Sequence, residues 1–144
     1  MLIPSRKLRC VSLFSVVIFA VFVSECSSIL DPIHASVMNY ISEGVELHIH
    51  CQSKDTDFGD HTLSYGDEFT WNFRINLFRS TLYWCNMWWN DVDGKLVQGT
   101  YDMYKAKRDW DRCGNECHFY VRKDCVLGYI KEKEDFECVY SWPK

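Results

Sequence analysis

The chain reads FTWNFRINL at Phe69–Leu77 and VELHIHC at Val45–Cys51, and in both stretches apolar and polar residues alternate strictly. Successive side chains of a β-strand point to opposite faces, so this alternation is typical of an antiparallel strand with one face in the core and the other in water. Both stretches are therefore predicted to be half-buried strands. Trp71 shares the apolar register with Phe69 and Phe73, which places it in the predicted core.

Further short strands are indicated along the rest of the chain. Thr81–Trp89 is aromatic on both faces, which favours a strand that is covered on each side. No stretch of ten or more residues shows helical periodicity, although Asp102–Trp110 has room for about one helical turn. The remaining predicted strands are Met38–Ile41, Thr100–Tyr104, Phe119–Arg122, Leu127–Ile130 and Phe136–Tyr140. The last two of these strands are expected to pair. Turn residues separate the strands at Lys54–Gly59, Ser64–Asp67, Asp91–Gly94 and Arg112–Asn115.

The number and spacing of these strands predict an all-β protein. About eight short strands at such intervals are typical of a sandwich or a barrel. We expect a small, disulfide-stabilised antiparallel β-sandwich, with two sheets packed face to face from about Asp31 to Lys144. No internal repeat divides the chain.

The first residues have the layout of a secretory signal peptide. Arg6, Lys7 and Arg9 precede the apolar stretch Val11–Ser24, and small residues follow it. This stretch of fourteen residues is shorter than the roughly 20 apolar residues that a membrane-spanning helix needs, so an uncleaved anchor is the less favoured alternative. We predict a signal peptide at residues 1–28, a sandwich domain at residues 29–144, and secretion to the cell exterior.

Cysteine usage agrees with an oxidising compartment. Two of the eight cysteines lie within residues 1–28 and an even number remains, which is typical of a disulfide framework. Six cysteines allow 15 pairings, and the only guess we make is that Cys138 ties the C-terminal end to an early strand. A zinc site on Cys113 and Cys117 is the disfavoured alternative, because secreted thiols oxidise. The expected disulfide cysteines are Cys51, Cys85, Cys113, Cys117, Cys125 and Cys138.

The charge balance argues against a polyanionic partner. Setting aside Arg6, Lys7, Arg9 and Glu25 from the 16 basic and 20 acidic residues leaves 13 and 19, a net charge of −6. Nucleic acids and anionic membrane surfaces need a basic footprint. We therefore expect no nucleic-acid partner and no membrane insertion.

Carboxylates cluster at Asp55, Asp57 and Asp60 around Gly59. Such spacing suits a calcium loop, but the twelfth position of an EF-hand loop starting at Asp55 is Gly66 rather than an acid. A solvated turn is the preferred interpretation, and no metal or cofactor is expected.

The histidines do not form a recognisable catalytic set. His48 and His50 would share the polar face of their strand, where they could hold a metal but are more often plain surface residues. His61 and His118 complete no known motif. A secreted hydrolase or ribonuclease using His48, His50 or His118 is kept as a minor alternative, and no catalytic residue is expected.

Aromatic residues are abundant in the middle of the chain. They could form a carbohydrate platform, but their register favours the core. Within Thr81–Trp89 the residues Trp84 and Trp88 share one face, whereas Tyr83, Cys85, Met87 and Trp89 share the other, so one face is expected to pack inside. The residues weighed for a platform are Trp71, Trp84, Trp88, Trp89, Tyr83 and Phe78.

An ordered set of motifs runs along the chain: HCQSKDTDFG at His50–Gly59, TLYWCNMWW at Thr81–Trp89, the Cys113-x-x-x-Cys117 pair and CVYSW at Cys138–Trp142. The first motif is similar to the signature of the plant self-incompatibility protein S1 family, whose members include the S-protein homologues, and the others follow in the family order. The resemblance extends from Val37 to Trp142. Phe119 is a departure, since the family usually has tryptophan there.

The resemblance implies a secreted β-sandwich that acts as an extracellular protein ligand rather than an enzyme. Founding members of the family are determinants of pollen rejection that a membrane receptor reads, while most relatives have no demonstrated part in it. We expect a monomer that binds a cell-surface receptor protein, with a toxin-like or effector role as the alternative. The expected binding loops are Lys54–Gly66 and Asn90–Gly99, with the candidate residues Lys54, Asp55, Asp57, Asp60, Asp91, Asp93 and Lys95.

Overall fold

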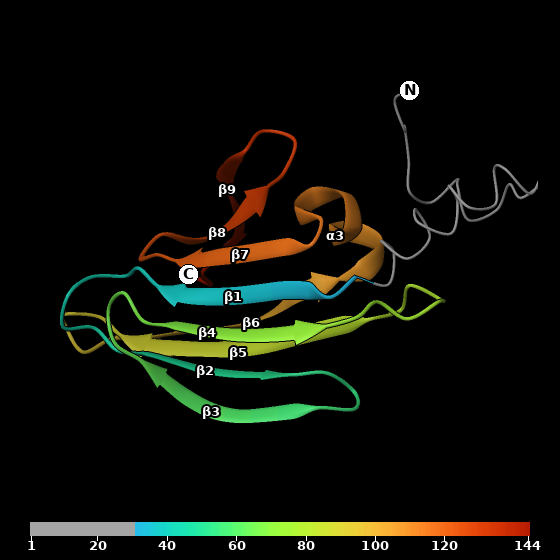
Figure 1. Cartoon of the computed structure of the whole chain (residues 1–144). Coiled ribbons are helices and arrows are strands. Elements are labelled where there is room, and N and C mark those ends of the chain that lie inside the picture. Colours follow the sequence, from blue (N-terminus) through green and yellow to red (C-terminus); the bar gives the residue numbers. More distant parts are fainter. Residues whose placement is uncertain (1–30) are drawn as a thin grey trace, which may run out of the picture. The chain divides into compact units, whose positions relative to one another are not determined.

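The computed structural model describes residues 31–144, which fold into nine strands and one helix (Figure 1). The predicted signal peptide lies outside the described residues. The elements of residues 31–144, in chain order, are β1 Ile33–Asn39, β2 Leu47–Gln52, β3 Asp57–Leu63, β4 Glu68–Phe73, β5 Leu82–Asn90, β6 Leu96–Lys105, α3 Ala106–Cys113, β7 Glu116–Val121, β8 Cys125–Ile130 and β9 Asp135–Ser141.

The strands form two sheets, as the all-β prediction requires. One sheet has the order β4-β1-β7-β8-β9 and the other has the order β3-β2-β5-β6. One pair departs from the expected antiparallel arrangement, because β1 and β7 run parallel. These two strands are far apart in the chain, so no hairpin forces them to run in opposite directions. The predicted pairing of the last two strands is confirmed, since β8 and β9 are antiparallel neighbours.

The core lies between the two sheets and follows the alternation of the sequence. In β2 the residues Leu47, Ile49 and Cys51 are fully buried while His48 and His50 face outward. Trp71 is only 4% exposed, which confirms its predicted core position. The largest fully buried side chains come from both sheets and include Trp89, Met87, Met103, Val37, Phe119 and Val121.

Several predicted boundaries were wrong. β1 spans Ile33–Asn39 rather than Met38–Ile41, and its buried alternation of Ile33, Ala35 and Val37 was overlooked. β4 ends at Phe73, so the last part of the alternating stretch continues as a loop. The helical segment is longer and later than expected, at Ala106–Cys113.

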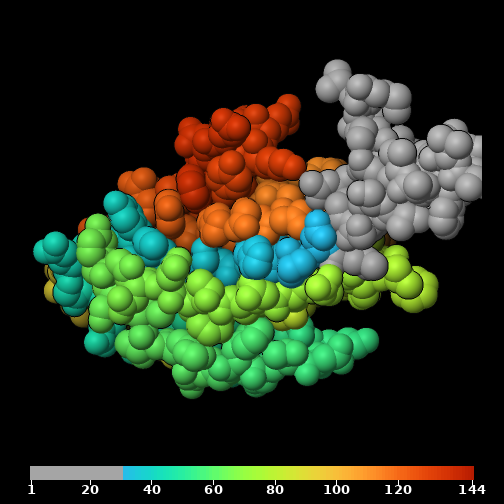
Figure 2. Space-filling view, viewed as in Figure 1, coloured from blue at the N-terminus to red at the C-terminus, as the bar shows by residue number. Residues whose placement is uncertain are grey.

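Strand β3 was missed altogether. Asp57–Leu63 was assigned partly to a turn and partly to a loop, yet it pairs with β2 along its length. It is an edge strand whose only buried residue is Leu63, so the sequence has no apolar alternation to reveal it. In Figure 2 its green atoms form the lower margin of the molecule.

Within residues 31–144, three disulfides join elements that are close in the fold. Cys51–Cys85 links the neighbouring strands β2 and β5, and Cys113–Cys117 links the end of α3 to β7. The guess for Cys138 was wrong, because it bonds Cys125 on the adjacent strand β8. No cysteine among residues 31–144 is free, so Cys113 and Cys117 are not available to zinc.

Helix α3 is fixed to the sandwich through a buried carboxylate. Asp109 has no exposed surface and accepts hydrogen bonds from Arg108, from Arg112 Nε at 2.8 Å and from the backbone N–H of Lys105 at 2.7 Å. Burial opposes ionisation of this group, but the bonds from the two guanidinium groups outweigh it and lower the pKa of Asp109. The carboxylate therefore stays charged and holds the helix at the end of β6.

Candidate functional site

The predicted binding residues lie at two opposite ends of one sheet. Lys54 and Asp55 belong to the turn between β2 and β3, whereas Asp91, Asp93 and Lys95 belong to the turn between β5 and β6. Because β2 and β5 are antiparallel neighbours, the first turn lies where β5 begins and the second where it ends. Nine strand residues at about 3.3 Å each separate the two turns, so they do not form a single site.

Asp57 and Asp60 lie on strand β3 rather than in a loop. His50 lies between them, with its Nε2 at 2.5 Å from Asp57 Oδ1 and its Nδ1 at 2.9 Å from Asp60 Oδ1. The hydrogen bond to Asp57 is the main cause of a raised pKa of His50. The N–H of Gly59 and then His50 lower the pKa of Asp57. The three side chains thus form a charged clasp between two strands.

The contacts of His50 in this clasp disfavour a role for it as a metal ligand or a catalytic base. Both ring nitrogens of His50 are engaged by carboxylates, and among residues 31–144 no three metal-binding side chains are grouped for an ion. His48 has a different role: its Nδ1 lies 3.0 Å from Thr62 Oγ1, and its ring stacks on Trp88.

His118 lies in the other sheet, between Ser36 and Glu116. Its Nδ1 is 2.6 Å from Ser36 Oγ and its Nε2 is 3.1 Å from Glu116 Oε2, an order that resembles a nucleophile, base and carboxylate. However, Ser36 is only 6% exposed and lies in the middle of β1, which is paired on both sides. The hydrogen bonds to the two neighbouring strands engage the backbone N–H groups there, so these N–H groups cannot serve as an oxyanion hole.

The loop between β4 and β5 carries the most exposed apolar side chains of the sandwich. Leu77 and Phe78 are each 86% exposed. Leu77 was predicted to lie in the apolar register of a strand and Phe78 in the core, and both predictions were wrong. Two adjacent apolar residues at a loop tip are a signal of an exposed binding surface. This signal was missed because Leu77 continues the alternation of the predicted strand.

This loop is held in shape by Asn76. Asn76 Oδ1 accepts from the N–H of Ser80 at 2.9 Å, its Nδ2 donates to Ser80 Oγ at 2.8 Å, and its own N–H donates to Thr81 Oγ1 at 2.9 Å. Arg79 adopts the left-handed conformation with φ 54° to close the turn. The loop therefore presents Leu77 and Phe78 on a fixed support.

The β2–β3 turn and the β4–β5 loop project from the same end of the sandwich (Figure 1). They line a common hollow of about 380 Å³, to which Lys54 and Asp55 contribute from one side and Asn76 and Ser80 from the other. The first turn is also fixed, since Ser53 Oγ accepts from the N–H of Thr56 at 3.1 Å. We call these two segments, 53–56 and 74–81, the loop end.

The opposite turn is a compact structural turn with one exposed apolar residue. Asp91 Oδ1 accepts from the N–H groups of Asp93 and Lys95, both at 2.9 Å. Gly94 has φ 79°, a conformation that glycine adopts without strain. Val92 at the tip is 82% exposed.

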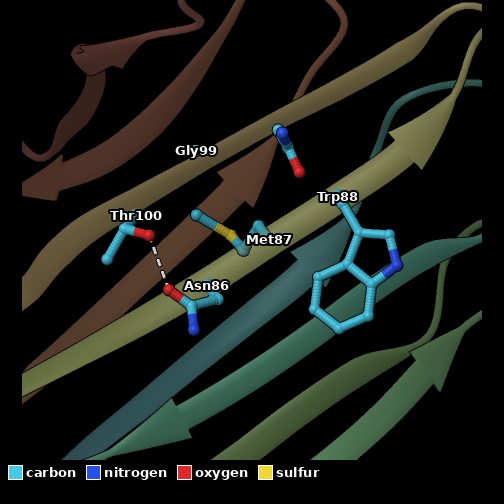
Figure 3. A pocket seen from close by; sticks show the side chains of 6 residues that line it. Asn86, Met87, Trp88, Gly99 and Thr100 are labelled. Carbon is cyan, nitrogen blue, oxygen red and sulfur yellow. Dashed lines mark hydrogen bonds between the residues drawn. The ribbon is translucent and has the colours of Figure 1, made fainter.

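A second hollow, of about 480 Å³, lies on the outward face of β5 and β6 (Figure 3). Asn86 and Trp88 of β5 stand opposite Thr100 and Gln98 of β6 as cross-strand pairs. Thr100 Oγ1 donates to Asn86 Oδ1 at 2.5 Å, and this bond is drawn in Figure 3. The outward register of Trp84 and Trp88 leaves both half-buried, while Trp89 on the other face is 2% exposed.

These features define a class of protein: a small, disulfide-linked β-sandwich with rigid surface loops. A family model described as plant self-incompatibility protein S1 matches residues 34–142. The chain therefore belongs to the plant self-incompatibility protein S1 family.

Curated relatives agree with this assignment. S-protein homolog 24 of Arabidopsis thaliana is 38% identical over 98 residues, which cover 68% of this chain and 62% of the relative's own length. Self-incompatibility protein S1 of Papaver rhoeas is 31% identical over 122 residues, covering 84% of this chain and 85% of the relative.

A solved structure shares the fold. It represents the self-incompatibility protein homologues, described as a widespread family of small, highly stable, secreted proteins from plants. The TM-score is 0.53 at 16% sequence identity, with 80% of this chain and 97% of that chain covered.

Proposed function

We propose that this protein is a secreted ligand that binds a cell-surface receptor protein through its loop end and acts as a monomer in signalling between cells. The observation that carries the proposal is the pair Leu77 and Phe78, each 86% exposed on a turn that Asn76 braces. Exposing two large apolar side chains to water is unfavourable for a free protein. A binding partner that covers them would recover that free energy.

The surroundings of these residues support a protein partner. Binding energy in protein interfaces concentrates in a few anchors, often aromatic, which are encircled by polar contacts that exclude water. The loop end has this composition, with Phe78 at the tip and Lys54, Asp55 and Ser80 around the adjacent hollow. Because the support is already ordered, little conformational entropy is lost when the tip is fixed by a partner.

A non-enzymatic role agrees with the family and with the geometry. The family members named above bear the names of S-protein homologues and of a self-incompatibility protein rather than names of enzymes. Ser36, whose hydroxyl contacts His118, is buried in a strand that is paired on both sides.

The test is binding of purified, fluorescently labelled protein to intact plant cells. Phe78→Asp places a charge at the tip and should weaken saturable binding at least tenfold, on the scale of an interface hot spot. Val92→Asp is the matched control, because Val92 is an equally exposed apolar tip at the other end of β5. It should bind like the wild type. Treatment of the cells with protease should remove binding.

Two results would contradict the proposal. In the first, Phe78→Asp binds as well as the wild type. In the second, the wild-type protein binds to or lyses protein-free liposomes, which is the behaviour of a membrane-active toxin. Among residues 31–144 no helix is both long and apolar enough to cross a bilayer.

A further inference from the structure

The outward face of β5 and β6 carries a hollow that the proposed receptor-binding end does not use. Its rim consists of Asn86, Trp88, Gln98 and Thr100, and its floor is the cross-strand pair Met87 and Gly99. We propose that this hollow is a binding site for a neutral sugar ring. The site lies on the sheet face, so the proposal does not depend on receptor binding at the loop end.

Trp88 provides the flat apolar surface that a sugar ring needs. His48 stacks on the indole with ring centroids 5.4 Å apart and an angle of 16° between the planes. His48 is in turn fixed by Thr62 on β3, with 3.0 Å between Nδ1 and Oγ1. Figure 3 shows the indole lying across the sheet with a ring face turned toward the viewer. The aromatic surface is therefore held in place before any ligand arrives.

The other rim residues supply directed hydrogen bonds. Asn86 uses its Oδ1 to accept from Thr100 Oγ1 at 2.5 Å, which fixes the orientation of the amide and leaves its NH₂ group as a hydrogen-bond donor. Gln98 is exposed on β6 and lines the same hollow, and its side-chain amide can both donate and accept hydrogen bonds. An amide pair of this kind matches vicinal hydroxyl groups, which donate and accept at once.

The charges of the site favour a neutral ligand. None of the four rim side chains carries a formal charge, and the segment outside residues 1–28 is net acidic. An anionic sugar would bring a carboxylate to a place without a cation, which is unfavourable. A volume of about 480 Å³ falls within the range of known small-molecule sites.

The backbone around the hollow argues against a peptide as the occupant. Peptides that bind sheets usually add a strand at an edge, where backbone groups are unpaired. β6 is the edge strand of its sheet, but the hollow lies over the face of the β5–β6 ladder, where Asn86 pairs with Thr100 and Trp88 pairs with Gln98. A ligand here meets side-chain amides, a hydroxyl and an indole. Of these ligand classes, a ring with several hydroxyl groups and an apolar face fits best.

The test uses NMR of the ¹⁵N-labelled protein titrated with three neutral disaccharides: cellobiose, mannobiose and N,N′-diacetylchitobiose. At least one should cause saturable shifts of the Trp88 indole N–H and of the side-chain amides of Asn86 and Gln98. Trp88→Ala should weaken that affinity about tenfold, the scale of losing an aromatic contact, whereas Trp88→Phe keeps a ring and should retain most of it. Trp84→Ala is the matched control, since it removes a half-buried indole of the same strand outside the hollow.

The outcomes separate the alternatives. The proposal is overturned if none of the three sugars gives saturable shifts, if the shifts fall outside the hollow, or if Trp84→Ala weakens binding as much as Trp88→Ala. Equal binding of digalacturonic acid would overturn the preference for a neutral ring. Backbone amide shifts of the variants that match the wild type elsewhere show that each variant is folded. Loss of cell binding in Phe78→Asp with sugar binding intact would keep this site distinct from the loop end.

Discussion

Removing the Cys51–Cys85 disulfide should cost the fold far more stability than removing Cys113–Cys117. The first bridge closes a loop with a sequence separation of 34 and the second a loop with a separation of 4. A disulfide stabilises a protein mainly by restricting the unfolded chain, and the longer loop contributes about 3.8 kcal/mol against about 1.9 kcal/mol for the shorter one. The paired Cys→Ala variants should therefore differ by about 2 kcal/mol.

The structure makes this comparison unusually well matched. Cys51, Cys85, Cys113 and Cys117 are all between 0% and 1% exposed, so each double variant removes a similar amount of buried sulfur and leaves a similar void. These costs largely cancel in the difference, and the loop entropy remains. The Cys125–Cys138 bridge, with a separation of 13, should rank between the other two at about 3 kcal/mol.

The measurement is urea unfolding of the wild type and the three double variants, followed by far-UV circular dichroism. With a denaturant slope of about 1.5 kcal/mol per molar, the midpoint of C51A/C85A should lie about 1.3 M below that of C113A/C117A. Equal midpoints at equal slopes would refute the reasoning. They would mean that loop closure in the unfolded chain does not set the contribution of these bridges.

Two further predictions concern charged clusters. Asp109→Asn should destabilise the fold by about 3 kcal/mol, because it leaves Arg112 largely buried without its carboxylate. The folded-state pKa of Asp109 is lowered, so its stabilisation is present above the unfolded pKa of about 3.9 and is lost as the pH falls further. The difference in unfolding free energy between the wild type and Asp109→Asn should therefore be smaller near pH 3 than near pH 7, as denaturant unfolding at both pH values would show. For His50 the folded-state pKa is raised, first by the hydrogen bond to Asp57, so its contribution is complete below about pH 6.5 and is lost as the pH rises through the folded pKa. The difference in Tm between the wild type and His50→Gln should accordingly be larger near pH 5.5 than near pH 8.5, and an unchanged difference would contradict the clasp.

Strict alternation predicted the central strands well, because it is imposed by a core that touches only one face of the sheet. Cys51 and Trp71 fall in the predicted register and are buried. The same rule failed beyond Phe73, where Ile75 is still buried at 6% exposure but Leu77 is a solvent-exposed tip. Periodicity records side-chain polarity, not whether a second layer still lies opposite, so it could not show where the strand ends.

The edge of the sheet was hidden for a related reason. Strand β3 has hydrogen-bonded neighbours on one side only and buries a single residue, Leu63. Glycine and aspartate in Asp57–Asp60 favour a turn locally, and only the pairing with β2 keeps this segment extended. The candidate residues Asp57 and Asp60 were consequently predicted to lie in the loop Lys54–Gly66, whereas both lie on a strand beside His50.

The aromatic residues show what a two-layer fold adds to a sequence pattern. The register of β5 separates Trp88 from Trp89 without ambiguity, but it does not say which face is covered. In a two-layer sandwich each sheet has one inner face, and the second layer cannot also cover the outer one. Trp89 is therefore buried, while Trp88 can reduce its exposure only through same-face neighbours such as His48. The indole of Trp88 is held in the outward register by contacts across three strands, yet its exposed surface adds nothing to the core. We therefore interpret it as part of a ligand site rather than as packing.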